Sequence, residues 1–348
     1  MTRPAARHAG VPEAMQLETI KAKRLTWSNV ARRQVSLAQI VLSAGALGVL
    51  LLAYAVSAHF HVHQQLYHYG RTWLKGNTAA EKNIWLPDFH VVIDAKPLAP
   101  DVANISGITY DYDNDRLLAV TNKGPMQLLA LDANGDIIAR YPLIGFDDTE
   151  GLAYLGNGRI VLCDEDLQQL DIITLPTQAR PIHVEEAQFI ALLINPSNQN
   201  KGFEGVTYDP ANDRLFAIKE RDPRQMFEVS GVLRSIDQGR LQIKIADRLD
   251  WITKSVAARD LSDGYFDPRT GHLLLLSDQS RSITELDGKG RFVSIRSLLG
   301  TFSDLQNSAP QPEGLTMDHD GNLYVVSEPN LFYKFSKVPK QPVEEIRP

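Results

Sequence analysis

The sequence repeats itself five times between residues 105 and 328, and this repetition constrains the fold more than any other feature. The copies read ISGITYDYDNDRLLAVTN from Ile105, TEGLAYLGNGRIVLCDE from Thr149, FEGVTYDPANDRLFAIKE from Phe203, SDGYFDPRTGHLLLLSD from Ser262 and PEGLTMDHDGNLYVVSE from Pro312. In each copy a small or acidic residue precedes a glycine, a short apolar strand follows, and a turn leads to a second, almost wholly apolar strand. Each copy therefore predicts a β-hairpin.

Two more strands are expected after most hairpins. Third strands are predicted at residues 127–132, 225–230, 282–287 and 331–335, and fourth strands at, for example, 136–141 and 291–296. The repeat glycines, Gly107, Gly151, Gly205, Gly264 and Gly314, are 44 to 59 residues apart, which is typical of four-stranded propeller blades. We therefore expect an all-β fold, a five-bladed β-propeller, with a degenerate sixth blade at 174–200 or 231–259 as the alternative.

The last repeat leaves no room for a fourth strand before the chain ends. The segment Phe89–Asp94 (FHVVID), ahead of the first repeat, is available to complete that blade. Such closure joins the two ends of the domain and removes exposed sheet edges. The propeller is therefore expected to occupy residues 85–348.

An apolar stretch precedes the propeller. Residues 35–58 hold no Asp, Glu, Lys or Arg, and these 24 residues exceed the roughly 20 that cross a bilayer. Arg24, Arg32 and Arg33 lie just before the stretch, so the positive-inside rule places the N-terminus in the cytoplasm. The alternative is a signal peptide cleaved after Val56-Ser57-Ala58, although the apolar run and the basic leader are long for one.

The expected protein is a single-pass protein of the inner membrane with an extracytoplasmic, periplasmic propeller. Its predicted parts are a basic cytoplasmic tail at 1–34, a transmembrane helix at 35–58, a juxtamembrane linker at 59–84 and the propeller at 85–348. The net charge is −6, but the tail holds seven Lys/Arg against two Asp/Glu, which leaves −11 for the rest. A propeller domain with this negative charge repels phosphate backbones, so we expect no nucleic-acid partner. The single cysteine, Cys163, lies in an apolar run and is expected to be a buried thiol.

Acidic residues recur at equivalent places in the repeats. In a propeller the first strand of each blade runs along the central channel, so the residues before the five glycines form a ring. That ring holds Ser106, Glu150, Glu204, Asp263 and Glu313. Fourteen residues after each glycine the chain returns to the same end, which gives a second ring of Thr121, Glu165, Lys219, Asp278 and Glu328, with Asp164 and Glu220 beside it. One mouth of the channel is therefore expected to be acidic.

Carboxylates packed so closely repel one another unless a cation offsets their charge. Calcium takes six to eight oxygen ligands, whereas the absence of Cys and His from these positions argues against zinc and copper. We therefore predict a Ca²⁺ site, with Glu150, Glu204, Asp263 and Glu313 as ligands and Glu165, Glu220, Asp278 and Glu328 as a second ring. The alternative is that these acids only start strands at a solvated edge. Lys219 and Arg221 are candidates for binding an anion.

The repeats resemble the SdiA-regulated (YjiK-like) family of bacterial propeller proteins. The resemblance covers residues 85–348 and rests on SGITYD, DTEGLAYLGNGRIVLCDE, FEGVTYDPANDRLFAIKER and PEGLTMDHDGNLYVVSE. It implies a membrane or signal anchor, a five-bladed propeller and a calcium site at Glu150, Glu204 and Glu313, with Asp263 where the fourth repeat has D-G. Ser106 departs from the acidic pattern. The resemblance implies no biochemical role.

Two functions are open at this stage. One is a binding or interaction module that engages an unidentified envelope ligand or protein. The other is a calcium-dependent hydrolase of phosphoesters or lactones, in which a metal-bound water attacks and Lys219 or Arg221 holds the substrate anion. No G-x-S-x-G motif supports acyl-enzyme chemistry.

Overall fold

The computed structural model describes residues 36–59, 62–76, 82–192 and 202–337. The predicted tail at 1–34 lies outside these residues. Helix α1 (Leu37–His59) contains one candidate membrane span, Leu37–Ala58. Its mean hydropathy is 2.2, and its most apolar stretch is not buried against the rest of the described chain. By length and composition this helix can cross a membrane, as the apolar run predicts.

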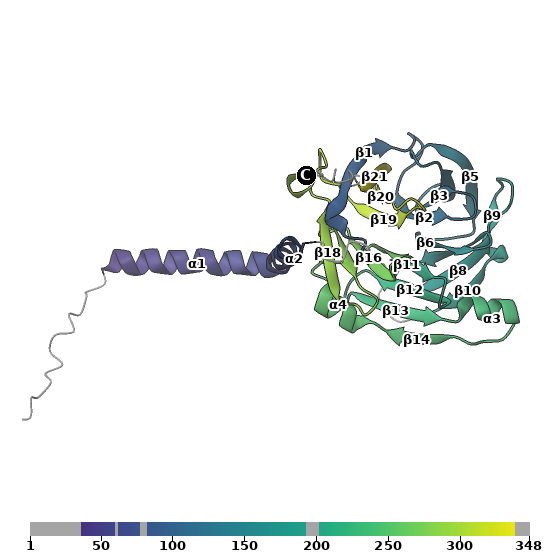
Figure 1. The fold of residues 1–348 in the computed structure, drawn as a ribbon. Coiled ribbons are helices and arrows are strands. Elements are labelled where there is room, and N and C mark those ends of the chain that lie inside the picture. The colour runs from purple at the N-terminus through teal and green to yellow at the C-terminus, as the bar shows by residue number, and fades with distance from the viewer. Residues whose placement is uncertain (1–35, 60–61, 77–81, 193–201, 338–348) are drawn as a thin grey trace, which may run out of the picture. The chain divides into compact units, whose positions relative to one another are not determined.

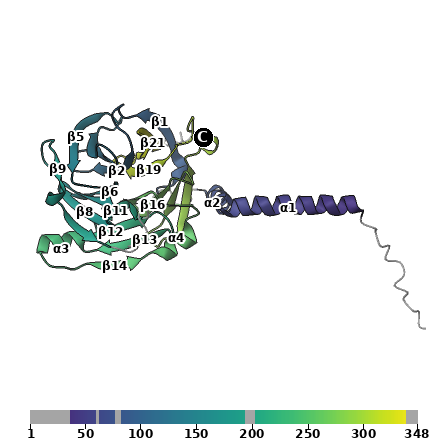
Figure 2. The same ribbon diagram turned by 180° about the vertical axis from the view of Figure 1, so that it is seen from behind.

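The propeller has the five predicted blades, arranged around a common axis (Figure 1 and, from behind, Figure 2). Blade one holds β2 (Ile105–Asp111), β3 (Arg116–Thr121), β4 (Gln127–Leu131) and β5 (Ile137–Ile144). Blade two holds β6 (Thr149–Gly156), β7 (Arg159–Asp164), β8 (Gln169–Thr174) and β10 (Gln188–Ala191). Blade three holds β11 (Phe203–Asp209), β12 (Arg214–Lys219), β13 (Gln225–Ser230) and β14 (Lys244–Asp247). Blade four holds β15 (Asp263–Asp267), β16 (His272–Ser277), β17 (Ser282–Leu286) and β18 (Phe292–Ser297). Blade five holds β19 (Pro312–Met317), β20 (Leu323–Ser327), β21 (Leu331–Lys337) and β1 (Phe89–Pro97).

The first strands of successive blades contact one another in a closed ring, in the order β2, β6, β11, β15, β19 and back to β2. The described residues of the two segments that could have hidden a sixth blade are used otherwise. After β8, the chain forms β9 (Ile182–His183), which pairs with β5, the 3-10 turn η2 (Val184–Glu186) and then β10. After β13, it forms α3 (Val232–Gln238), β14 and α4 (Leu249–Ser255).

The second strand of each blade is apolar along its middle because this part is buried on both faces. In β3, Leu118 and Val120 pack toward blade two, in the cluster that contains Leu152. On its other face Leu117 packs toward blade five, in the cluster that contains Phe332. The main core therefore lies between neighbouring blades, and Cys163 is one of its buried residues, as expected.

Strand β1 closes the ring as predicted, because it pairs antiparallel with β21 as the outer strand of blade five. The chain just before β1 is fixed by a buried side chain of blade four. Glu285 accepts hydrogen bonds from the backbone N–H groups of Ile84 and Trp85, each at 2.9 Å, and lies 2.7 Å from Nδ1 of His272. This carboxylate therefore links the start of the propeller, at the 3-10 turn η1 (Leu86–Asp88), to β17.

The predicted juxtamembrane linker contains a helix, α2 (Val62–Lys75). It packs on β18, the outer strand of blade four. The remaining short element, the 3-10 turn η3 (Gly300–Phe302), follows β18.

Candidate metal centre at the channel mouth

The inner row of mouth residues is set by a backbone irregularity. In β2, β11 and β19 the pairing register shifts by one residue at Ser106, Glu204 and Glu313, and β6 has a similar shift around Glu150. Such a bulge leaves one residue out of the ladder and turns its side chain in a new direction. Glu150, Glu204 and Glu313 consequently line a cavity at one mouth of the channel, as the repeats predict.

Blade four differs by one residue from the predicted alignment. Its first strand has no bulge, and Asp263 pairs opposite Leu276 as Gly205 pairs opposite Ile218 in blade three. Asp263 thus occupies the position of the repeat glycines, and Ser262 is the residue that lines the mouth. The prediction of Asp263 in the inner ring was wrong because the D-G pair of this repeat imitates E-G one position further along the chain.

Asp263 is fully buried, away from the mouth cavity. Its Oδ2 accepts a hydrogen bond of 2.9 Å from the backbone N–H of Leu315 in blade five. Burial raises the pKa of Asp263 well above its ordinary value. The side chain therefore links two blades.

The outer row of the mouth comes from the residue that directly follows the second strand of each blade. It consists of Asn122, Glu165, Glu220, Asp278 and Glu328, and all five line the cavity. Counting fourteen residues from the glycine predicted this row correctly in blades two, four and five; in blade four Gly264 lies one residue after the usual glycine position and the hairpin is one residue longer, so the two offsets cancel. In blades one and three the hairpin is one residue longer, so Thr121 and Lys219 fall one residue short of it.

A third row was not predicted. It lies two residues before the inner row and consists of Asn104, Asp148, Gly202, Asp260 and Gln311. The carbonyl oxygens of Asn104, Asp148 and Gln311 each accept the backbone N–H of the outer-row residue of the same blade, at 2.9–3.2 Å. For Asp148, the sequence held one signal: the acidic pair Asp147-Asp148 stands directly before the T-E-G of the second repeat.

The mouth cavity has a volume of about 320 Å³, and every residue that lines it is polar or charged. Eight of these residues carry carboxyl groups and two, Lys123 and Arg221, are basic. Arg221 pairs with Glu220 at 2.9 Å. Lys219 does not line the cavity, and its ammonium group donates hydrogen bonds to the backbone carbonyls of Arg221 and Pro223. Of the two predicted anion-binding residues, the structure therefore places only Arg221 at the mouth.

Glu150 lies at the centre of the tightest acidic group. Its two carboxylate oxygens accept hydrogen bonds from the Ser106 hydroxyl and, at 2.8 Å, from the Asn122 side-chain amide. Asp148, Glu150 and Glu165 each offer a carboxylate oxygen, and these oxygens all lie within 4.8 Å of one another. Asp148 adopts a left-handed backbone conformation, φ 45°, which is uncommon for a residue other than glycine and is often found at functional sites.

Burial raises the pKa values of several carboxyl groups of the mouth, and repulsion from neighbouring acids contributes to the rise. The pKa of Glu150 rises to about 8, with Asp148 and Glu165 contributing after burial. Burial brings the pKa of Glu220 to about 7 and that of Asp278 to about 6. The pKa values of Glu204 and Glu313 lie well above their ordinary value, also chiefly because of burial. Without a cation, much of this mouth would hold protons at neutral pH.

The donor set fits a hard cation. The groups that face the cavity are carboxylates, side-chain amides, a serine hydroxyl and two basic groups, with no Cys or His among them. Asn122 also has a buried side-chain oxygen, Oδ1, with no hydrogen-bond partner in the structure. Oxygen donors of this kind suit calcium or magnesium rather than zinc or copper.

The fold and the mouth define a five-bladed β-propeller with an acidic channel mouth. The chain belongs to the SdiA-regulated family, because a model of that family matches residues 81–336. This match includes all five blades.

Solved propeller structures resemble the chain more distantly. A luciferin-regenerating enzyme is 14% identical, with 72% of this chain and 81% of that one covered and a TM-score of 0.42. Regucalcin, a calcium-binding protein from Agrobacterium tumefaciens, is 10% identical, with 70% and 93% covered and a TM-score of 0.45. A virginiamycin B lyase from Staphylococcus aureus is 13% identical, with 69% and 68% covered and a TM-score of 0.38. Similarities at this level carry no argument about function.

Proposed function

We propose that this protein is a membrane-anchored binding module whose propeller holds a calcium ion at the acidic mouth and engages an envelope ligand or protein there. The observation that carries the proposal is the group formed by Asp148, Glu150 and Glu165, whose carboxylate oxygens approach one another within 4.8 Å. Three acids held this closely need a positive charge between them or must take up protons.

The surroundings of this group supply little positive charge of their own. Lys123 and Arg221 are the two basic residues lining the mouth, and Arg221 already pairs with Glu220. Apart from proton uptake by the acids themselves, a divalent cation is the remaining means of compensating so many carboxylates. Glu150 and Glu165, with Asp148 beside them and Glu204 and Glu313 across the mouth, are the residues that would hold it.

Calcium is favoured over magnesium by the character of the site. The mouth offers many oxygen donors from all five blades around a cavity of about 320 Å³. Calcium accepts six to eight oxygen ligands in flexible geometry, whereas magnesium requires a tight octahedron and usually keeps several of its waters. A bound calcium ion would tie the blades together at this end and give the mouth a fixed shape for recognition.

We place the propeller outside the cytoplasm of the cell. The apolar helix α1 can span a membrane, and Arg24, Arg32 and Arg33 before it favour a cytoplasmic N-terminus. Cleavage of the segment as a signal sequence would deliver the propeller to the same side of the membrane. In either case the mouth would be exposed to calcium at about millimolar concentration. Extracellular calcium sites bind in this range.

The alternative function is hydrolysis of a phosphoester or lactone. It is favoured by one observation: the mouth cavity is much larger than one ion and carries a half-exposed guanidinium, that of Arg221. When bound, calcium would supply a polarised water and a Lewis acid for the substrate oxygen. Arg221 would hold the substrate anion, and a carboxylate such as Glu220, whose pKa is about 7, could take the proton of the attacking water.

Titration calorimetry of the full chain in detergent, stripped with a chelator, tests the proposal. We expect saturable calcium binding that Glu150→Gln and Glu165→Gln each weaken at least about tenfold, because each removes a charged ligand. Glu186 is exposed, pairs with Arg180 six residues before it and does not line the mouth, so Glu186→Gln is the matched control and should bind calcium like the parent. An absence of calcium binding by the parent would overturn the proposal. Calcium-dependent turnover of phosphoester or lactone substrates, lost in Arg221→Met, would replace the binding module by the hydrolase.

A further inference from the structure

Helix α2 exposes most of its large apolar residues and buries two polar ones. Leu66, Tyr67, Trp73 and Leu74 are 62–82% exposed, whereas Tyr69 is half-buried against the propeller. At 100° per residue these four fall on one face. The opposite face carries His68 and Thr72, which are buried. This is the reverse of what a helix on the surface of a water-soluble domain shows.

The buried face holds α2 on the propeller. The His68 ring lies 4.0 Å from the Phe292 ring, centre to centre, and burial, followed by the nearby charge of Arg71, lowers the pKa of His68 to about 4. The guanidinium of Arg71 stacks over the same Phe292 ring at 5.2 Å. These contacts with β18 fix which side of the helix faces outward.

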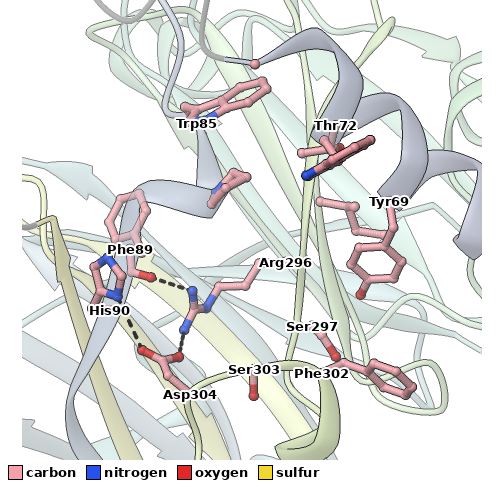
Figure 3. Close-up of a pocket in the computed structure, with 14 residues that line it drawn as sticks. Tyr69, Thr72, Trp85, Phe89, His90, Arg296, Ser297, Phe302, Ser303 and Asp304 are labelled. Carbon is pink, nitrogen blue, oxygen red and sulfur yellow. Dashed lines mark hydrogen bonds and ion pairs between the residues drawn. The ribbon is translucent and has the colours of Figure 1, made fainter.

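A cavity of about 510 Å³ lies between α2, the start of β1 and the end of β18 (Figure 3). Figure 3 shows Tyr69 and Thr72 on the helix side and Arg296 on the propeller side, where Arg296 bonds to the carbonyl oxygen of Phe89 and to Asp304. Trp73 and Phe302, from segments far apart in the sequence, both line this cavity, and Phe302 is 74% exposed. The apolar surface of α2 therefore continues onto η3.

The position of α2 in the chain indicates what covers this surface. Only two residues separate α1, which ends at His59, from the first residue of α2, Val62. If α1 spans the membrane, α2 has too little chain before it to lie far from the lipid headgroups. Helix α2 has no acidic residue and carries Arg71 and Lys75, which suits an anionic lipid surface.

We infer that α2 is an interfacial helix: Leu66, Tyr67, Trp73 and Leu74, together with Phe302, insert into the headgroup region of the bilayer. Trp and Tyr favour this region because each has an apolar ring and a polar group, and Leu and Phe add apolar area below it. The inference rests on the proposed membrane anchor. It adds a second membrane contact that would hold the propeller against the bilayer through blade four.

Spin labels on the full chain in vesicles of phosphatidylcholine and phosphatidylglycerol test this inference. Labels are attached through Leu74→Cys on α2, Leu50→Cys in α1 and Leu241→Cys in the loop after α3, where Leu241 is 80% exposed and serves as the matched control. The unlabelled parent is the blank, because its Cys163 is buried. Collisions with oxygen, which concentrates in lipid, are compared with collisions with a water-soluble nickel complex.

We expect the oxygen-to-nickel collision ratio at position 74 to be at least about threefold that at position 241, as for a residue below the headgroups. A ratio at position 74 equal to that at 241, with a high ratio at position 50, would overturn the interfacial helix and leave the anchor intact. A low ratio at position 50 would contradict the anchor itself. Protection of position 74 from both reagents with spin–spin broadening would show a second copy on this face and would also overturn the inference.

Discussion

A methyl group on Gly151 would lie 2.6 Å from the carbonyl oxygen of Glu204 in the next blade. Similar contacts link Gly107 to Glu150 and Gly314 to Gly107, so the inner strands touch backbone to backbone around the ring. Side chains at these positions would push neighbouring blades apart. The glycine of each E-G pair is thus required by packing, and the acid before it is held at the mouth.

The first prediction concerns this packing. Gly151→Ala should lower the free energy of unfolding by about 1–3 kcal/mol, because the new methyl group meets rigid backbone that must shift. Thermal unfolding of the full chain in detergent measures it. Gly124→Ala is the matched control, since a Cβ there would meet nothing within 4 Å. Equal stability of the two variants would contradict the close packing of the inner strands.

The second prediction concerns ring closure. Glu285→Ala should cost about 3 kcal/mol or more, because it leaves the buried N–H groups of Ile84 and Trp85 without their acceptor. The control, Glu186→Ala, breaks an exposed ion pair and should cost at most about 1 kcal/mol. Proteolysis of the chain just before β1, followed by mass spectrometry, should accelerate only in the first variant. A Glu285→Ala protein as stable as the control would show that this carboxylate does not hold the closure.

Much of this architecture follows from the sequence, and the errors have local causes. The hairpins, the five blades and closure by Phe89–Asp94 depend on repeat periodicity and apolar pattern, which survive small shifts of register. The mouth depends on register to a single residue. Asp263 was misplaced because a buried aspartate replaced a glycine, and Lys219 because one hairpin is a residue longer. Asp148 was missed because it lies just before the aligned repeat, although the acidic pair Asp147-Asp148 was visible in the sequence.

The third prediction concerns pH. The folded pKa of Glu150 is about 8 against an ordinary value of 4.5, so between these pH values the metal-free folded state binds more protons than the unfolded state. The contribution of Glu150 to the stability of the metal-free protein should therefore be greatest at and below pH 4.5. It should fall as the pH rises toward 8. Thermal unfolding in the presence of a chelator measures this slope, and Glu150→Gln should flatten it. A stability that rises over this range in the parent would contradict the raised pKa.

The fourth prediction separates Asp263 from the mouth. Asp263→Asn keeps the side chain's size and its acceptor for the Leu315 N–H, so calcium affinity should stay within about twofold of the parent. Glu204→Gln and Glu313→Gln, at the mouth, should each weaken calcium binding. Calorimetric titration compares the three variants with the parent under one condition. A loss of calcium binding in Asp263→Asn as large as in Glu204→Gln would return Asp263 to the ligand set.

The position of the ion is tested most directly by crystals of the full chain soaked with terbium, which replaces calcium and scatters anomalously. We predict one strong anomalous peak at the channel mouth, about 2.3–2.6 Å from carboxylate oxygens of Glu150 and of at least one of Glu165, Glu204 and Glu313. Crystals of Glu150→Gln soaked in the same way should show a weakened peak or none. A mouth without a peak in the parent, or with the same peak in Glu150→Gln, would contradict the claim that this acidic group holds the metal.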